Sequence, residues 1–317
     1  MRCPASPALE AEFPDEGSVF AAEGTVAHDI AATCLVEDRS PHEFVGTTAI
    51  EDGFEITVDK VMAAYVEDYM KLVREYAQGG VLLVEQKVPI GHLTGEADAT
   101  GTSDAVIVHA EERRLTIIDL KYGMGVKVYA DGNEQAMMYG LGALERYEQL
   151  CDFDEVCMVI HQPRLNHVAE HWLKVEDLMA FAKEVTAAAE LTRAGITTMV
   201  PGEKQCKFCK AKATCPALRA DVGGIVHEAA SLDDFADLVP LKPDSTTGDN
   251  YLSIAMGMVG MVEDWCKGIR AEVARRLLAG QEVKDFKLVE GKRGNRKWAD
   301  EAAVENVMKS FRLRQDE

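Results

Sequence analysis

The chain has 317 residues, with 34 Lys and Arg against 54 Asp and Glu, for a formal net charge of −20. A chain this acidic does not bind nucleic acid or an anionic membrane by overall charge, so any phosphate contact requires local basic residues. Hydrophobic residues make up 47% of the chain, a share typical of folded globular proteins and not of disordered ones.

The N-terminus has no apolar segment of the kind found in secretory signals, because Cys3-Pro4 is followed by acidic residues. The segment 253–262 is taken as the most apolar stretch, and its ten residues are too few to span a bilayer. We therefore expect a cytoplasmic protein without a membrane contact. In that reducing compartment the eight cysteines are expected as buried thiols or metal ligands, not as disulfides.

Hydrophobic periodicity predicts an alternation of helices and strands along the first 200 residues. Helices are expected over 26–37, capped by Thr25, and over 58–76, ending before Gly79-Gly80. Three strands follow at 81–88, 103–108 and 115–121, then a helix at 132–147, strands at 155–160 and 168–175, and a helix at 176–193. This order predicts an α/β (α+β) fold with a mixed central sheet flanked by helices.

Beyond residue 200 the composition changes twice. A segment rich in cysteine and lysine is followed by an acidic linker, and then by a helix expected over about 249–279. We therefore divide the chain into a core with an N-terminal helical flank at 1–200, a Cys-rich segment at 201–220, and a helical appendage with a basic loop at 221–317.

Two aspartates are expected to face each other across the second and third strands. A symmetric turn centred between Glu111 and Glu112 pairs residues whose numbers sum to 223, which places Asp104 opposite Asp119. Like charges in that position are destabilising, and a bound divalent cation offsets this. Lys121 lies two residues after Asp119 on the same strand face, where an ammonium group can orient or deprotonate an attacking water. Taken alone, Asp-x-Lys is far more often part of a polar surface hairpin than of a catalytic site.

The surrounding residues favour the catalytic interpretation. Gln135 and Tyr139 lie four apart on one face of the next helix, so both can point to the same edge of the sheet. His28 lies on the early helix after Gly24. The set G-x-x-x-H, G-x-x-D, D-x-K and Q-x-x-x-Y resembles the RecB-like branch of the PD-(D/E)XK nuclease superfamily, where many relatives have Glu in the position of Asp119.

This resemblance implies a restriction-endonuclease-like core. It implies that one or two Mg²⁺ or Mn²⁺ ions are bound by His28, Asp104, Asp119 and the Leu120 carbonyl, with Lys121 assisting the water. Oxygen ligands suit these ions, and the histidine favours Mn²⁺. Gln135 and Tyr139 are expected to organise the active site or the substrate. For Glu85, on the preceding strand, a metal-site role and a solvated surface carboxylate remain equal alternatives.

A second group of residues consists of cysteines. Cys206, Cys209 and Cys215 lie within ten residues, and three thiolates leave a four-ligand site incomplete. Cys3 is available as the fourth. One distant N-terminal cysteine with a C-terminal C-x2-C-x5-C group resembles the iron–sulfur members of this nuclease branch, which implies a structural 4Fe-4S cluster. Zn²⁺ remains the alternative, because spacing alone does not separate the two metals.

Basic residues near the C-terminus form a candidate nucleic-acid site. The segment 284–297 holds six basic and two acidic residues. We expect phosphate and stacking contacts from four of its basic members and the tryptophan that follows them, namely Lys292, Arg293, Arg296, Lys297 and Trp298. The alternative is an ordinary solvated run of charge.

Several segments, among them Cys3–Ser6, Ala22–Thr25, Lys287–Gly291 and Asn295–Trp298, are similar to an uncharacterised phage and prophage family of this superfamily. The expected function is a metal-dependent DNA exonuclease that resects duplex ends for phage recombination or repair. A ring-forming homo-oligomer and a phage single-strand annealing or binding protein are expected partners. The alternatives are a non-catalytic DNA- or partner-binding module, and a structure-specific endonuclease or RNase.

Overall fold

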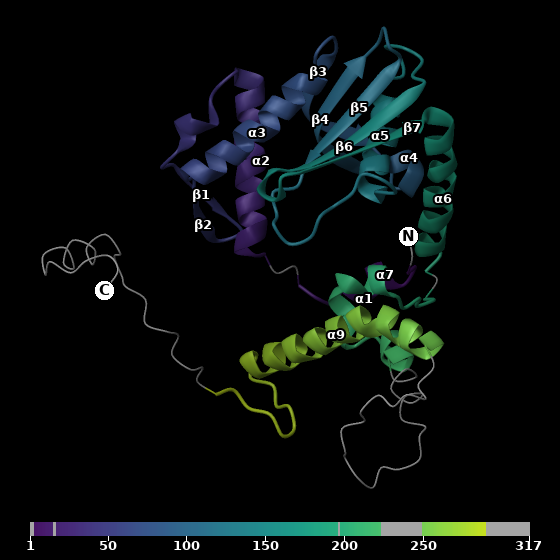
Figure 1. The fold of residues 1–317 in the computed structure, drawn as a ribbon. Helices are drawn as coiled ribbons and strands as arrows, with labels where there is room; N and C mark the ends of the chain where they lie inside the picture. The colour runs from purple at the N-terminus through teal and green to yellow at the C-terminus, as the bar shows by residue number, and fades with distance from the viewer. Residues whose placement is uncertain (1–2, 15–16, 196, 223–248, 290–317) are drawn as a thin grey trace, which may run out of the picture. The chain divides into compact units, whose positions relative to one another are not determined.

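The structure is a computed structural model that describes residues 3–14, 17–195, 197–222 and 249–289. The chain divides into two compact units, Met1–Thr247 and Gly248–Glu317. The first unit contains the sheet, the helices that cover it and the Cys-rich segment (Figure 1).

A five-stranded mixed sheet forms the centre of the first unit. Its strands follow the order β3-β4-β5-β6-β7, where β5 and β6 are parallel and the other neighbours are antiparallel. The strands are β3 (Val81–Pro89), β4 (Thr100–His109), β5 (Arg114–Leu120), β6 (Glu155–Gln162) and β7 (His167–Lys174). The predicted register between β4 and β5 is confirmed, since Ala105 pairs with Ile118 and His109 with Arg114.

Helices cover both faces of this sheet, and each face has its own apolar cluster. On one face, α2 (Val19–Glu37) and α3 (Lys60–Tyr76) pack against alternate residues of β4, β5 and β6. On the other face, α5 (Glu134–Tyr147) and α6 (Val175–Arg193) pack against the residues between them (Figure 1). Both faces are therefore buried, as in other sheets of α/β proteins, and the predicted fold class is confirmed.

The helix α2 is longer than predicted. It begins at Val19, and the Ser18 side chain caps it by accepting a hydrogen bond from the Ala21 backbone N–H. Thr25 is not the cap; its hydroxyl donates to the Ala21 carbonyl inside the helix. A serine seven residues earlier thus provides the cap that the sequence assigned to Thr25.

The hairpin of β1 (Thr48–Glu51) and β2 (Phe54–Thr57) was not predicted. Its turn is Asp52-Gly53, and both residues have positive φ, 50° and 81°. That combination matches the type I′ turn that Asp-Gly favours between two strands, so a local signal was present. Short helical segments also went unpredicted; they are α1 (Ser6–Glu10), η1 (Pro41–Phe44), α4 (Gly91–Thr94), η2 (Pro163–Leu165), α7 (Glu203–Lys207) and η3 (Lys210–Ala213).

By length and composition α2 is long and apolar enough to cross a membrane. One stripe of α2, including Val26, Ile30 and Cys34, is buried against α3 and the sheet, as expected for a core helix of a globular domain. The fold is therefore compatible with the predicted cytoplasmic location.

In the second unit the described residues form α9 (Asp249–Leu278) and a short turn in which Val283 bridges Phe286. The predicted helix over 249–279 is confirmed. The candidate nucleic-acid residues 292–298 lie outside the described residues.

Candidate metal and catalytic site

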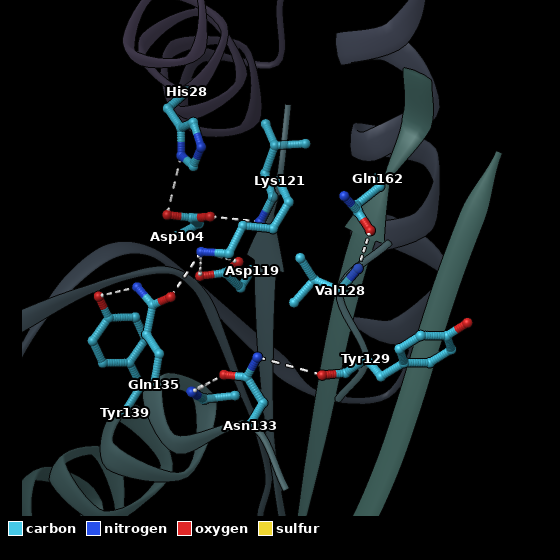
Figure 2. Close-up of polar contacts among 12 residues, drawn as sticks. His28, Asp104, Asp119, Lys121, Val128, Tyr129, Asn133, Gln135, Tyr139 and Gln162 are labelled. Carbon is cyan, nitrogen blue, oxygen red and sulfur yellow. Dashed lines mark hydrogen bonds and ion pairs between the residues drawn. The ribbon is translucent and has the colours of Figure 1, made fainter. Parts of the chain in front are cut away.

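The motif residues gather where β5 ends and β4 passes beside it, between α2 and α5 (Figure 2). His28 comes from α2, Asp104 from β4, Asp119 and Lys121 from the end of β5, and Gln135 and Tyr139 from α5. The structure therefore brings together residues that are more than 100 positions apart in the chain.

Asp104 links two elements through its two carboxylate oxygens. Oδ1 lies 3.2 Å from Nδ1 of His28, and Oδ2 accepts a hydrogen bond of 2.6 Å from the Leu120 backbone N–H. The Leu120 N–H lies beyond Ala105 and Ile118, the last residues that pair between β4 and β5, so the Asp104 side chain bonds to the backbone where the strands no longer pair. The carboxylate thereby holds the end of β5, and with it the backbone at Leu120, at a set distance from α2.

Asp119, Lys121, Gln135 and Tyr139 form one hydrogen-bonded chain. Nζ of Lys121 lies 2.8 Å from Oδ2 of Asp119 and donates to Oε1 of Gln135 over 2.8 Å. Nε2 of Gln135 donates to the Tyr139 hydroxyl over 2.9 Å (Figure 2). The lysine is therefore oriented from two sides, and the predicted convergence of these four side chains is observed.

Gly101 leaves room for the tyrosine of this chain. A Cβ atom at position 101 would lie 2.5 Å from Cε1 of Tyr139, closer than any normal contact. The glycine of the G-x-x-D motif therefore permits the close approach of β4 to α5. At Gly24, by contrast, an added Cβ would meet no atom within 4 Å other than those of its chain neighbours and the backbone of its own helix.

The regular alternation of β3 is interrupted at Glu85. Leu83 and Val88 are five residues apart and would face opposite sides of a regular strand, yet both pack in the cluster on the α5 side. Between them Glu85 has a φ of +50°, in the left-handed region that costs a non-glycine residue about 1–3 kcal/mol. The neighbouring pairs, Val84 with Ala105 and Gln86 with Ser103, place this distortion opposite Asp104.

Glu85 thereby joins the metal-binding candidates. Ligand atoms of His28, Glu85 and Asp104 all lie within 4.8 Å of one another. One imidazole and two carboxylates are a donor set suited to Mn²⁺ or Mg²⁺. In the sequence Glu85 is one carboxylate after four apolar strand residues, near where the resembled family often has an acidic residue, and these signs did not separate a ligand from a solvated side chain.

Asp119 lies close to this group but is paired with Lys121. It is 5% exposed, and burial followed by repulsion from Asp104 raises the pKa of its carboxyl to about 6, against the opposing effect of Lys121. Burial and then Asp104 also raise the pKa of Glu85. For His28, burial lowers the pKa, but the hydrogen bond to Asp104 and the surrounding carboxylates outweigh it, so that the pKa is raised. The carboxylates of Glu85, Asp104 and Asp119 repel one another even though Lys121 pairs with one of them, and a divalent cation would neutralise the remaining negative charge.

The four predicted cysteine ligands line one pocket. Cys3, Cys206, Cys209 and Cys215 lie around it with apolar neighbours that include Leu9 and Leu218. Two sulfurs accept backbone N–H groups, Cys3 from Val200 at 3.5 Å and Cys206 from Gly202 at 3.4 Å. Such N–H to sulfur contacts are common around bound thiolates. Within the described residues, no three of these sulfurs lie within 4.8 Å of one another.

The chain belongs to the family described as "Protein of unknown function (DUF2800)", which matches residues 1–317. Among solved structures, the chain is similar to one titled "Crystal structure of SSO0001", at 14% sequence identity over 68% of this chain and 95% of the other, with a TM-score of 0.24.

Proposed function

We propose that this protein is a metal-dependent nuclease of the RecB-like PD-(D/E)XK type that cleaves phosphodiester bonds in DNA. The observation that carries the proposal is the convergence of His28, Asp104 and Glu85 beside the hydrogen-bonded chain from Asp119 to Tyr139. A surface hairpin with a polar face does not require a buried aspartate, a strained glutamate and a lysine oriented from two sides.

His28, Glu85 and Asp104 would hold one divalent cation, and Asp119 with the Leu120 carbonyl would complete the binding of that ion or a second. A bound Mg²⁺ or Mn²⁺ supplies a Lewis acid for the scissile phosphate and lowers the pKa of the attacking water. The cluster fits such a cation because its carboxylates repel one another and their pKa values are raised.

The protein's own groups position the reaction. The Lys121 ammonium, held by Asp119 and Gln135, lies where it can donate a hydrogen bond to the attacking water or to a phosphate oxygen. Tyr139 fixes the amide of Gln135 and, through it, the lysine. Asp104 sets the spacing between the histidine and the end of β5. Preorganisation of this kind is how proteins stabilise charge that develops in a transition state.

For the four cysteines we propose a structural 4Fe-4S cluster. They line one pocket, and two of them accept backbone N–H groups. Zn²⁺, which four thiolates bind at ~2.3 Å, is the alternative metal for these residues. A cluster held by these four residues would join the N-terminal segment to residues 206–215.

The specific activity we favour is exonucleolytic resection of duplex DNA ends in the bacterial cytoplasm. The net negative charge of the protein repels DNA, and binding confined to a DNA end needs few phosphate contacts. The ring-forming oligomer and the phage single-strand annealing partner stay predictions.

The test is degradation of end-labelled linear duplex DNA by anaerobically purified protein in Mn²⁺ or Mg²⁺, beside circular duplex, single-stranded DNA and RNA. We expect linear duplex to be degraded and Lys121→Ala to lower the rate by at least about a hundredfold, in the range for loss of a general acid–base group. Lys174→Ala is the matched control, since Lys174 is an exposed lysine at the end of β7.

If the intact, metal-loaded protein degrades none of these substrates, the enzyme proposal is wrong and the binding module becomes the better account. Cleavage of circular duplex or of RNA at the higher rate would instead favour the endonuclease or RNase.

A further inference from the structure

The loop that joins β5 to α5, residues 121–133, differs in charge from the rest of the chain. Residues 121–129 contain Lys121 and Lys127 and no acidic residue, in a protein of net charge −20. The loop starts at the lysine of the catalytic site and ends just before Gln135. Over the whole loop Asp131 offsets one of the two lysines, which leaves a net charge of +1, and both ends of the loop are attached to the site.

Large apolar side chains on this loop face solvent. Met124 is 54% exposed, Val126 60% and Tyr129 62%. Three exposed apolar side chains within six residues are unfavourable for a free surface, and such patches commonly mark a binding site. In Figure 2, Val128 and Tyr129 lie on the side of Lys121 opposite His28, so this part of the loop extends away from the carboxylates.

Side chains of Gln162 and His167 hydrogen-bond to the backbone of the loop and fix its conformation. Gln162 is 2% exposed and uses both ends of its amide, accepting from the Val128 N–H at 2.6 Å and donating to the Val126 carbonyl at 3.0 Å. His167 Nε2 lies 2.9 Å from the Val128 carbonyl oxygen, and its ring packs edge to face with Tyr129 at 5.2 Å between centroids. A buried amide fully committed to two backbone groups indicates that the loop conformation is specified, which makes the exposure of Tyr129 a fixed feature.

We propose that this loop binds a single-stranded stretch of the substrate, with a base stacked on Tyr129 and a backbone phosphate near Lys127; this inference rests on the proposed nuclease function. Tyr129 is an exposed aromatic residue two positions after Lys127 in the chain, and proteins use aromatic rings together with basic residues to hold unpaired nucleotides without sequence preference. The strand whose phosphate lies at Lys121 would pass over the loop as it leaves the carboxylates.

The experiment measures binding apart from cleavage. Full-length protein carrying Lys121→Ala, which is expected to bind without cutting, is titrated into a fluorescently labelled single-stranded oligonucleotide and into a blunt duplex of the same sequence, and anisotropy is recorded. Adding Tyr129→Ala should weaken single-strand binding by about 5- to 150-fold, the equivalent of one lost base stack. Tyr129→Phe should stay within about twofold of the parent, because the ring is kept.

Leu150→Ala is the control for loss of an exposed apolar side chain, since Leu150 is 60% exposed and lies beyond the end of α5. Lys127→Ala should reduce the dependence of single-strand affinity on salt by about one counterion. Circular dichroism spectra check that each variant is folded.

The inference is overturned if Tyr129→Ala binds the single strand like its parent, if Tyr129→Phe loses as much as Tyr129→Ala, or if the parent does not bind single strands. The first outcome would leave the loop as a surface for a protein partner. Failure of the nuclease proposal is distinguishable, because it appears as absent cleavage by the protein with Lys121 intact, whatever the anisotropy shows.

Discussion

Asp104 on β4 accepts a 2.6 Å hydrogen bond from the backbone N–H of Leu120 on β5, while its other oxygen faces His28. One carboxylate therefore has both a structural and a chemical role, since it terminates the β4–β5 pairing and also carries the charge that a cation needs. The two roles can be separated by substitution.

Asp104→Asn keeps an oxygen for the Leu120 N–H but removes the charge, whereas Asp104→Ala removes both. We expect the unfolding free energy of Asp104→Asn to lie within about 1 kcal/mol of the parent's, and Asp104→Ala to be destabilised by about 1–3 kcal/mol because a partly buried N–H loses its partner. Both should lose Mn²⁺ binding. Urea unfolding and calorimetric titration with Mn²⁺ measure the two effects, and equal stability of the two variants would contradict the structural role.

Stability of the metal-free protein should fall as the pH rises from about 4 to about 6. The pKa of Asp119 is raised from its ordinary value to about 6 by burial and by Asp104. In this window the native carboxyl keeps a proton that the unfolded chain has released, so raising the pH favours unfolding. Thermal unfolding in chelator across this range, beside Asp119→Asn, checks the direction; Asp119→Asn should remove this part of the pH dependence.

Metal binding should have the opposite pH dependence. His28, Glu85 and Asp119 all have raised pKa values, so each competes for a proton that must leave before a cation binds. Added Mn²⁺ should therefore raise the melting temperature more at about pH 7.5 than at about pH 5, with release of protons on binding. Titrations in buffers of different ionisation enthalpy would reveal those protons, and pH-independent binding would count against this ligand set.

The φ of +50° at Glu85 makes glycine the better truncation at this position. On an ordinary strand Glu→Ala is tolerated better than Glu→Gly, but left-handed backbone costs alanine about 1–2 kcal/mol that glycine avoids. We expect Glu85→Gly to be the more stable variant by urea unfolding, and both to bind Mn²⁺ more weakly than the parent. A more stable Glu85→Ala would show that the backbone strain is absent.

Two motif glycines should respond in opposite ways to alanine. Gly101→Ala places a methyl group 2.5 Å from the Tyr139 ring, and we expect a loss of about 1–3 kcal/mol from overpacking together with slower cleavage. Gly24→Ala lies inside α2, and outside its chain neighbours and the backbone of that helix the added carbon meets no atom within 4 Å; it should stabilise the helix by about 0.5–1 kcal/mol. Chemical unfolding of both variants gives the comparison, and a destabilised Gly24→Ala would indicate a close contact at that helix position.

The cysteine site predicts a visible spectrum. Anaerobically purified protein should contain iron and sulfide and show broad absorbance that Cys3→Ser or Cys206→Ser abolishes or greatly weakens. Cys151→Ser is the control, since Cys151 is a partly exposed thiol that does not line the cysteine pocket. Stoichiometric zinc with no visible absorbance would identify the alternative metal.

Much of the site follows from local rules that a sequence states directly. Strand alternation places Asp119 and Lys121 on one face of the sheet, and helix periodicity places Gln135 and Tyr139 on one face of α5. A symmetric turn sets the β4–β5 register. The β1–β2 hairpin was equally local, and its Asp52-Gly53 turn was a signal sufficient to predict it.

Only the tertiary structure decided the positions of Glu85 and Gln162. Glu85 enters the metal-binding group because left-handed backbone interrupts β3, and alternation alone does not reveal such an interruption. Gln162 is a strand-end amide whose partners lie 34 and 36 residues earlier in the chain. The sequence predicts how residues within one element or one hairpin are arranged, because the covalent chain fixes the spacing between them. Contacts between distant segments depend on how the elements pack, and only the folded chain determines those.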